Sequence, residues 1–198
     1  MLARAHMLGL RAVALAEHAD GVTMARTLEQ IQELAQAYSA LWDLMVVAAV
    51  ELTGVPPAAL AEEVARARRL GAGLVLVHGE GMGNAAVPGT NLAAIEAGAD
   101  ILAHPGLLAE AEAARAAQTK TALMLTAQPG HCLATGHVWR LARQHGAPVV
   151  VTSGAHQEGE LLGPGGLRAV ALGAGMGEVE WRACQTHTWT LACRKLKV

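Results

Sequence analysis

Residues 73–106 read GLVLVHGEGMGNAAVPGTNLAAIEAGADILAHPG, and this stretch decides the fold. Two apolar runs, residues 74–77 and 101–103, flank a helix-like segment that Thr90 opens, and each run ends in a histidine, His78 or His104. A strand, a helix and a second strand within about 30 residues have the size of one βαβ unit. Because chemistry in parallel α/β folds lies where strands end and loops begin, we expect His78 and His104 at the same rim.

The rest of the chain continues this alternation of strand and helix. We expect further strands at residues 11–16, 44–50, 122–127 and 148–153, and helices at 27–38, 57–70, 107–117, 135–145, 167–172 and 177–196. Such an alternation predicts a parallel sheet. With about six strands and no linker between them, residues 1–198 are expected to form a single α/β domain.

Composition narrows the class of protein. A chain of 198 residues that is 53% hydrophobic can bury a core, and a net charge near −2 without blocks of like charge argues against a nucleic-acid-binding surface. The longest apolar stretch, residues 44–50, is too short to span a membrane. Arg11 interrupts the signal-like start, and Cys132, Cys184 and Cys193 form no CxxC pair. These features predict reduced thiols and a cytoplasmic location.

Five of the six predicted strands end in a side chain that can bind a metal: His18, Glu51, His78, His104 and His156. Each group therefore falls at the end of a strand in a βα repeat, which places the set around one rim. Imidazole nitrogen and carboxylate oxygen are ligands that Zn, Mn and Fe accept. A divalent ion there can polarise a phosphate ester and lower the pKa of a water to about 7. A single histidine at a strand end is more often structural, but five together favour a metal site.

Three further groups have alternative interpretations. His131 and His137 follow the fifth predicted strand, where they either contact a substrate phosphate or have simple loop roles. Glu80 either orients His78 or is a solvated loop charge. The histidines at positions 6, 145 and 187 fall on predicted helices, and a structural role is expected for them.

The same motifs resemble a known family. VHGE at 77–80, VPGTNLAAIEAG at 87–98 and DILAHPG at 100–106 are similar to the PHP (polymerase and histidinol phosphatase) superfamily of metal-dependent phosphoesterases, in particular its short histidinol-phosphatase-like members. The likeness continues through LTAQPGHCLATGH at 125–137 and TSGAH at 152–156. It implies a distorted (β/α)7-type barrel, here incomplete, with about six parallel strands because the family's first strand is absent.

The chain departs from the family's metal ligands in several places. Family members open with a His-x-His strand, which is missing before the first helix here, and Gly154 stands where they have a metal-binding Asp. The resemblance implies that one metal site keeps Glu51, His78 and His104. A second keeps only the shared Glu51, and a third keeps His18 and His156. We therefore expect one to two ions of Zn, Mn or Fe rather than three.

Two functions follow as expectations. The first is a metal-dependent phosphomonoesterase, a hydrolase of reduced turnover that acts on a small phosphorylated substrate. The alternative is a catalytically inactive remnant that binds a metal, a phosphate ligand or a protein partner. The missing strand leaves a sheet edge, and edges recruit strands or are covered. We therefore expect either a homo-oligomer or a terminal segment packed over the gap.

Overall fold

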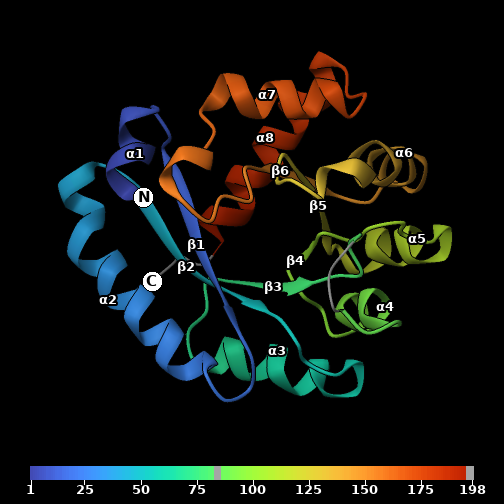
Figure 1. The fold of residues 1–198 in the computed structure, drawn as a ribbon, viewed down its shortest axis with the longest axis horizontal. Coiled ribbons are helices and arrows are strands. Elements are labelled where there is room, and N and C mark those ends of the chain that lie inside the picture. Colours follow the sequence, from blue (N-terminus) through green and yellow to red (C-terminus); the bar gives the residue numbers. More distant parts are fainter. Residues whose placement is uncertain (83–85, 195–198) are drawn as a thin grey trace.

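A computed structural model of the chain describes residues 1–82 and 86–194. Its centre is a sheet of six parallel strands that follow one another in sequence order and curl into a half-barrel (Figure 1). The expected α/β architecture and the incomplete barrel are confirmed. The strands are β1 (Ala12–Ala19), β2 (Met45–Leu52), β3 (Leu74–His78), β4 (Ile101–Ala103), β5 (Ala122–Thr126) and β6 (Val149–Thr152).

Helices precede, connect and follow the strands, and those between successive strands cover the outer face of the sheet. They are α1 (Leu2–Met7), α2 (Met24–Trp42), α3 (Leu60–Arg69), α4 (Thr90–Glu96), α5 (Glu110–Thr119), α6 (Thr135–His145), α7 (Pro164–Gly173) and α8 (Glu178–Cys193), with short 3-10 turns at Pro57–Ala59, Cys132–Ala134 and Glu158–Glu160. The expected boundaries of α6 are confirmed. Helix α2 is longer than expected, because it continues to a left-handed C-cap at Asp43, and the expected end of α8 at residue 196 lies outside the described residues.

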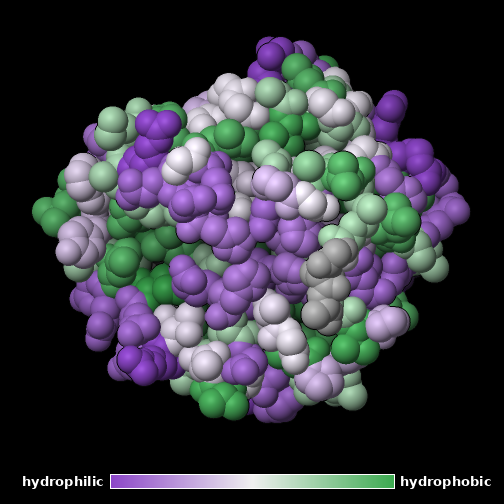
Figure 2. All heavy atoms as spheres, viewed as in Figure 1, coloured by the Kyte–Doolittle hydropathy of each residue, from purple (hydrophilic) through white to green (hydrophobic). Residues whose placement is uncertain are grey.

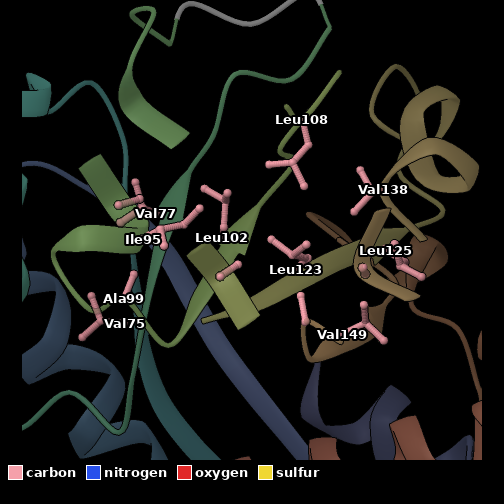
Figure 3. Packing of buried hydrophobic residues seen from close by; sticks show 14 of the residues in the cluster. Val75, Val77, Ile95, Ala99, Leu102, Leu108, Leu123, Leu125, Val138 and Val149 are labelled. Atoms are coloured by element: carbon pink, nitrogen blue, oxygen red, sulfur yellow. The ribbon is translucent and has the colours of Figure 1, made fainter. Parts of the chain in front are cut away.

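The main core lies between the outer face of the sheet and the helices (Figure 3). Alternate residues of the central strands point to this side, among them Val75, Val77 and Leu102, and they meet Ile95 of α4. Because both faces of a parallel sheet are covered, its strands are continuous apolar runs rather than alternating patterns. For this reason, the short apolar runs at residues 74–77 and 101–103 predict buried strands.

The C-terminal helix α8 closes the concave side of the half-barrel. Leu191 of α8 packs among inward-facing residues such as Val47, Leu76 and Met124, and α8 contacts both edge strands, β1 and β6. The Arg11 guanidinium at the start of β1 lies 4.5 Å above the Trp189 ring, a cation–π contact. A terminal segment thus packs over the open side, and the homo-oligomer stays a prediction.

Within the described part of the chain, no helix combines the length and hydrophobicity needed to cross a membrane. The three cysteines are free thiols, with Cys132 exposed and Cys184 buried.

Candidate metal centre

The candidate site lies where the inward-facing side chains of the sheet reach the ends of the strands. Side chains of a strand alternate between its two faces. In β2, Val47 and Ala49 face inward, so Glu51 does as well, and in β3 the series Leu74 and Leu76 leads to His78. The register of β1 on β2 pairs His18 with Glu51. Three neighbouring strands therefore end in polar side chains on the same face of the sheet. The inward-facing residues before them in the strands are apolar.

His18, Glu51 and His78 form a group that could hold a metal ion. One ligand atom from each lies within 4.8 Å of the other two. Nδ1 of His78 is 2.5 Å from Oε1 of Glu51, and Nδ1 of His18 is 4.0 Å from the same oxygen. The sequence grouped Glu51 and His78 with His104, whereas this geometry groups them with His18.

Glu51 is a carboxylate held in its ionised form. Its burial alone would raise the pKa, but the hydrogen bond with His78 and the electrostatic effect of the surrounding imidazole rings outweigh that effect. The net result is a pKa below the ordinary value for Glu, although only 7% of the residue is exposed. An ionised, buried carboxylate beside two imidazoles is a donor set that suits a divalent cation.

Thr53 fixes the orientation of His18. The Thr53 hydroxyl donates to the carbonyl oxygen of Glu51 at 3.3 Å, and it lies 2.6 Å from Nδ1 of His18. When the hydroxyl proton is used in this way, the hydroxyl oxygen accepts from Nδ1–H of His18, and that tautomer leaves Nε2 with a free lone pair. Metal-binding histidines commonly have such a partner on the ring nitrogen that does not bind the ion.

His104 and His131 form a second part of the cluster. Their ring centroids are 4.0 Å apart. The ring centroid of His78 lies 5.0 Å from that of His104 and 5.6 Å from that of His131. His104 has a left-handed backbone, with φ of 49°, and is 5% exposed. Among the described residues, neither buried Nδ1 atom has a hydrogen-bond partner. Buried polar atoms without partners are rare, so both nitrogens are candidates to meet a bound ion or ligand.

Both rings of this pair are held in their neutral form. Burial lowers the pKa of His104 to about 3, aided by the nearby rings of His131, His78 and His18 and opposed by Glu51. Burial also lowers the pKa of His131, and the neighbouring His78 adds to the effect. A neutral imidazole is the form that binds metals.

His156 adds a further ring on the side of β6. Its ring stacks parallel to that of His18, with the centroids 5.6 Å apart, and its Nε2 lies 2.7 Å from Nε2 of Gln128. Gly154 has φ of 60°, and a Cβ there would lie only 2.5 Å from Oγ1 of Thr126 and 2.9 Å from Oε1 of Gln128. Position 154 therefore has neither a ligand nor room for one.

Other groups named from the sequence lie elsewhere. Nε2 of His137 is 2.8 Å from the Leu108 carbonyl oxygen, and the His137 ring is outside the ring contacts of the cluster. Glu80 has neither of its two expected roles, because its Oε1 accepts from the backbone N–H groups of Gly89 and Asn91 at the start of α4. His187 lies within α8, as expected for a helical histidine.

Two residues that contact histidines of the cluster were not predicted from the sequence: Thr53, which contacts His18, and Gln128, which contacts His156. Thr53 follows Glu51 by two positions, and a hydroxyl just past a strand end is a usable signal for a group that orients a ligand. Gln128 gives no such signal, because its contact with His156 spans 28 residues.

Comparison with known proteins places the chain in a family. No protein-family model matches it. It is similar to a protein of Methanocaldococcus jannaschii that is described as the uncharacterized protein MJ1295. The two are 31% identical over 189 residues, which cover 94% of this chain and 87% of the relative. The chain therefore belongs to the same family as the Methanocaldococcus jannaschii protein MJ1295.

Proposed function

We propose that the protein is a divalent-metal-dependent phosphomonoesterase of the histidinol-phosphatase-like type. One observation carries the proposal: a buried carboxylate and five imidazoles from strand ends and loops gather at one rim of a parallel half-barrel. The motif likeness to the PHP superfamily supports the same reaction class. In this proposal the ion is Zn, Mn or Fe, as the donor atoms favour.

The chain's own residues divide into two tasks. His18, Glu51 and His78 would hold the ion, because they supply two imidazole nitrogens and one ionised carboxylate oxygen within 4.8 Å. The ion would polarise the phosphate ester and lower the pKa of a water. His104 and His131 would contact the phosphate oxygens through the Nδ1 atoms that have no partner in the described part of the chain.

Their burial makes these contacts effective. Preorganised donors in a site of low dielectric stabilise developing charge far better than they do in water, and this is usually the largest catalytic contribution. His104 is 5% exposed, and its left-handed backbone fixes the ring beside His131. The positioning is thus built into the fold before a substrate arrives.

The second candidate is a remnant that binds a metal or phosphate but does not catalyse. Gly154 favours it, since the Asp that PHP proteins have at that position is missing and Gln128 fills the nearby space. Fewer charges then stabilise the transition state, so turnover would be low or absent.

Activity on a phosphomonoester decides between the two. The protein is stripped with EDTA, reloaded with Mn²⁺ or Zn²⁺, and assayed on p-nitrophenyl phosphate. We expect hydrolysis that requires the metal and is lost in the Glu51→Gln variant, while His6→Ala, on α1, is unaffected. His131→Ala should lower kcat/KM more than His137→Ala, because His137 already has a protein partner. Hydrolysis that resists EDTA would remove the metal mechanism, and metal uptake without hydrolysis would favour the remnant.

A further inference from the structure

The loops around the candidate site lack permanent positive charge. The six segments that follow the strands, residues 20–23, 53–59, 79–89, 104–109, 127–134 and 153–163, contain no Lys or Arg, although the chain has 15. Arg66 of α3 does reach one of these loops, at the carbonyl oxygen of Gly21, but Glu63 lies beside it at 3.4 Å. Sites for nucleotides and other polyanions rely on guanidinium and ammonium groups. These loops are therefore unsuited to a substrate with several phosphates.

The same rim carries exposed apolar side chains. Met82 and Val87 follow β3, Leu107 follows β4, and Leu133 follows β5, with exposed fractions of 46%, 53%, 72% and 72%. Leu107 comes three residues after His104, and Leu133 two residues after His131. In the view of Figure 2, hydrophobic residues flank a hydrophilic middle. Single exposed apolar side chains are ordinary, but these lie on three neighbouring loops, two of which carry His104 and His131 while the third directly follows His78.

We propose that the substrate is a monoester of a single phosphate with an uncharged, apolar alcohol, whose hydrocarbon part contacts Leu107 and Leu133. This inference rests on the proposed phosphomonoesterase. In the reaction, the oxygen of a water bonds to phosphorus while the bond from phosphorus to the ester oxygen breaks. The alcohol leaves with a proton, and inorganic phosphate is the second product. In this arrangement the imidazoles would hold the phosphate, and the two leucines would contact the alcohol.

A series of esters with similar leaving groups tests the inference. The Mn²⁺-loaded protein is assayed for kcat/KM on hexyl phosphate, glycerol phosphate and AMP, which differ in the apolar area and charge of the alcohol. We expect hexyl phosphate to be preferred by about tenfold or more, since each methylene that leaves water contributes to binding. The double variant Leu107→Ser, Leu133→Ser should bring the ratio of hexyl phosphate to glycerol phosphate close to one. A ratio of two substrates is unaffected by partial loss of folded protein.

Leu41→Ser is the matched control, because Leu41 is 73% exposed on α2, outside the six loops. It should leave the substrate ratio unchanged. Equal or better hydrolysis of AMP or glycerol phosphate overturns this inference alone, as does a double variant whose ratio equals that of the native protein. No hydrolysis of any phosphomonoester overturns the proposed function, and this inference with it.

Discussion

The imidazole rings of His104 and His131 lie with their centroids 4.0 Å apart, and a buried Nδ1 atom of each has no hydrogen-bond partner among the described residues. Two rings so close cannot readily carry a proton each, because like charges in a buried site repel and lose their hydration. Burial is the main cause that lowers the pKa of both residues; His131 adds to the effect on His104, and His78 adds to the effect on His131. The pair is therefore available to a ligand as neutral imidazoles.

This burial predicts a pH dependence of stability for the metal-free protein. His104 has a pKa of about 3 in the folded protein, against an ordinary value of 6.5. Between about pH 3 and pH 6.5, His104 is therefore protonated in the unfolded chain but neutral in the folded protein. The free energy of unfolding should fall as the pH drops through this window, by up to about 1.4 kcal/mol per pH unit from this residue. Urea unfolding at several pH values measures it. His104→Gln should weaken the dependence, while exposed His6→Gln should not. The same slope in His104→Gln and the native protein would contradict the assignment.

Gly154 should not tolerate a side chain. Its φ is 60°, and an added Cβ would come within 2.5 Å of Thr126 Oγ1, so Gly154→Ala should cost about 2 kcal/mol or more in the free energy of unfolding. Gly154→Asp should be destabilised as well and gain no metal affinity. At Gly159, in the same loop, an added Cβ would meet no atom within 4 Å, so Gly159→Ala serves as the control. Denaturant unfolding compares the three, and a stable Gly154→Asp that binds more metal would refute this account of the position.

The role of α8 as the inner cover of the half-barrel can be tested at Leu191. This side chain is 4% exposed and packs on the inner face of the sheet. Leu191→Ala should lower the free energy of unfolding by about 2 to 5 kcal/mol through the cavity it leaves. Val179→Ala on the same helix, at an 81% exposed position, should change it by less than about 0.5 kcal/mol. Equal effects of the two substitutions would mean that α8 does not cover the sheet.

The geometry of the site and the family resemblance predict different third ligands beside Glu51 and His78. The geometry selects His18, whereas the resemblance to the PHP superfamily selects His104. His18→Ala should weaken Zn²⁺ binding by more than about 100-fold, and His104→Ala by about tenfold, the effect of a neighbour that is not a ligand. Calorimetric titration of both variants measures the order, and the reverse order would return His104 to the ligand set.

The sequence predicted the parallel sheet well, because buried strands such as residues 74–77 are short apolar runs with sharp ends. Alternation along β2 and β3 also carries Glu51 and His78 to the inner face. Strict alternation from Ile101 and Ala103 would instead turn His104 outward. Its left-handed backbone brings the ring back, and a residue pattern does not encode that turn.

The remaining contacts of the site could not be predicted, because they depend on the conformations of the loops. The close approach of the His131 ring to the His104 ring and the contact of Gln128 with His156 join segments 27 and 28 residues apart, and loop conformation decides both. The role of Glu80 as a cap of α4 was likewise not among its expected roles, because it depends on Glu80 meeting backbone groups nine and eleven residues further along the chain.

We expect Glu51, together with His18 and His78, to hold a divalent ion. Isothermal titration of the EDTA-stripped protein with Zn²⁺ or Mn²⁺ measures this binding, with Glu51→Gln and His6→Ala titrated beside the native chain. The native protein and His6→Ala should each take up at least one ion per chain, and Glu51→Gln should lose this binding because the neutral amide removes the only carboxylate of the triad. A native protein that takes up neither ion, or a Glu51→Gln variant that binds as tightly as the native protein, would contradict the account.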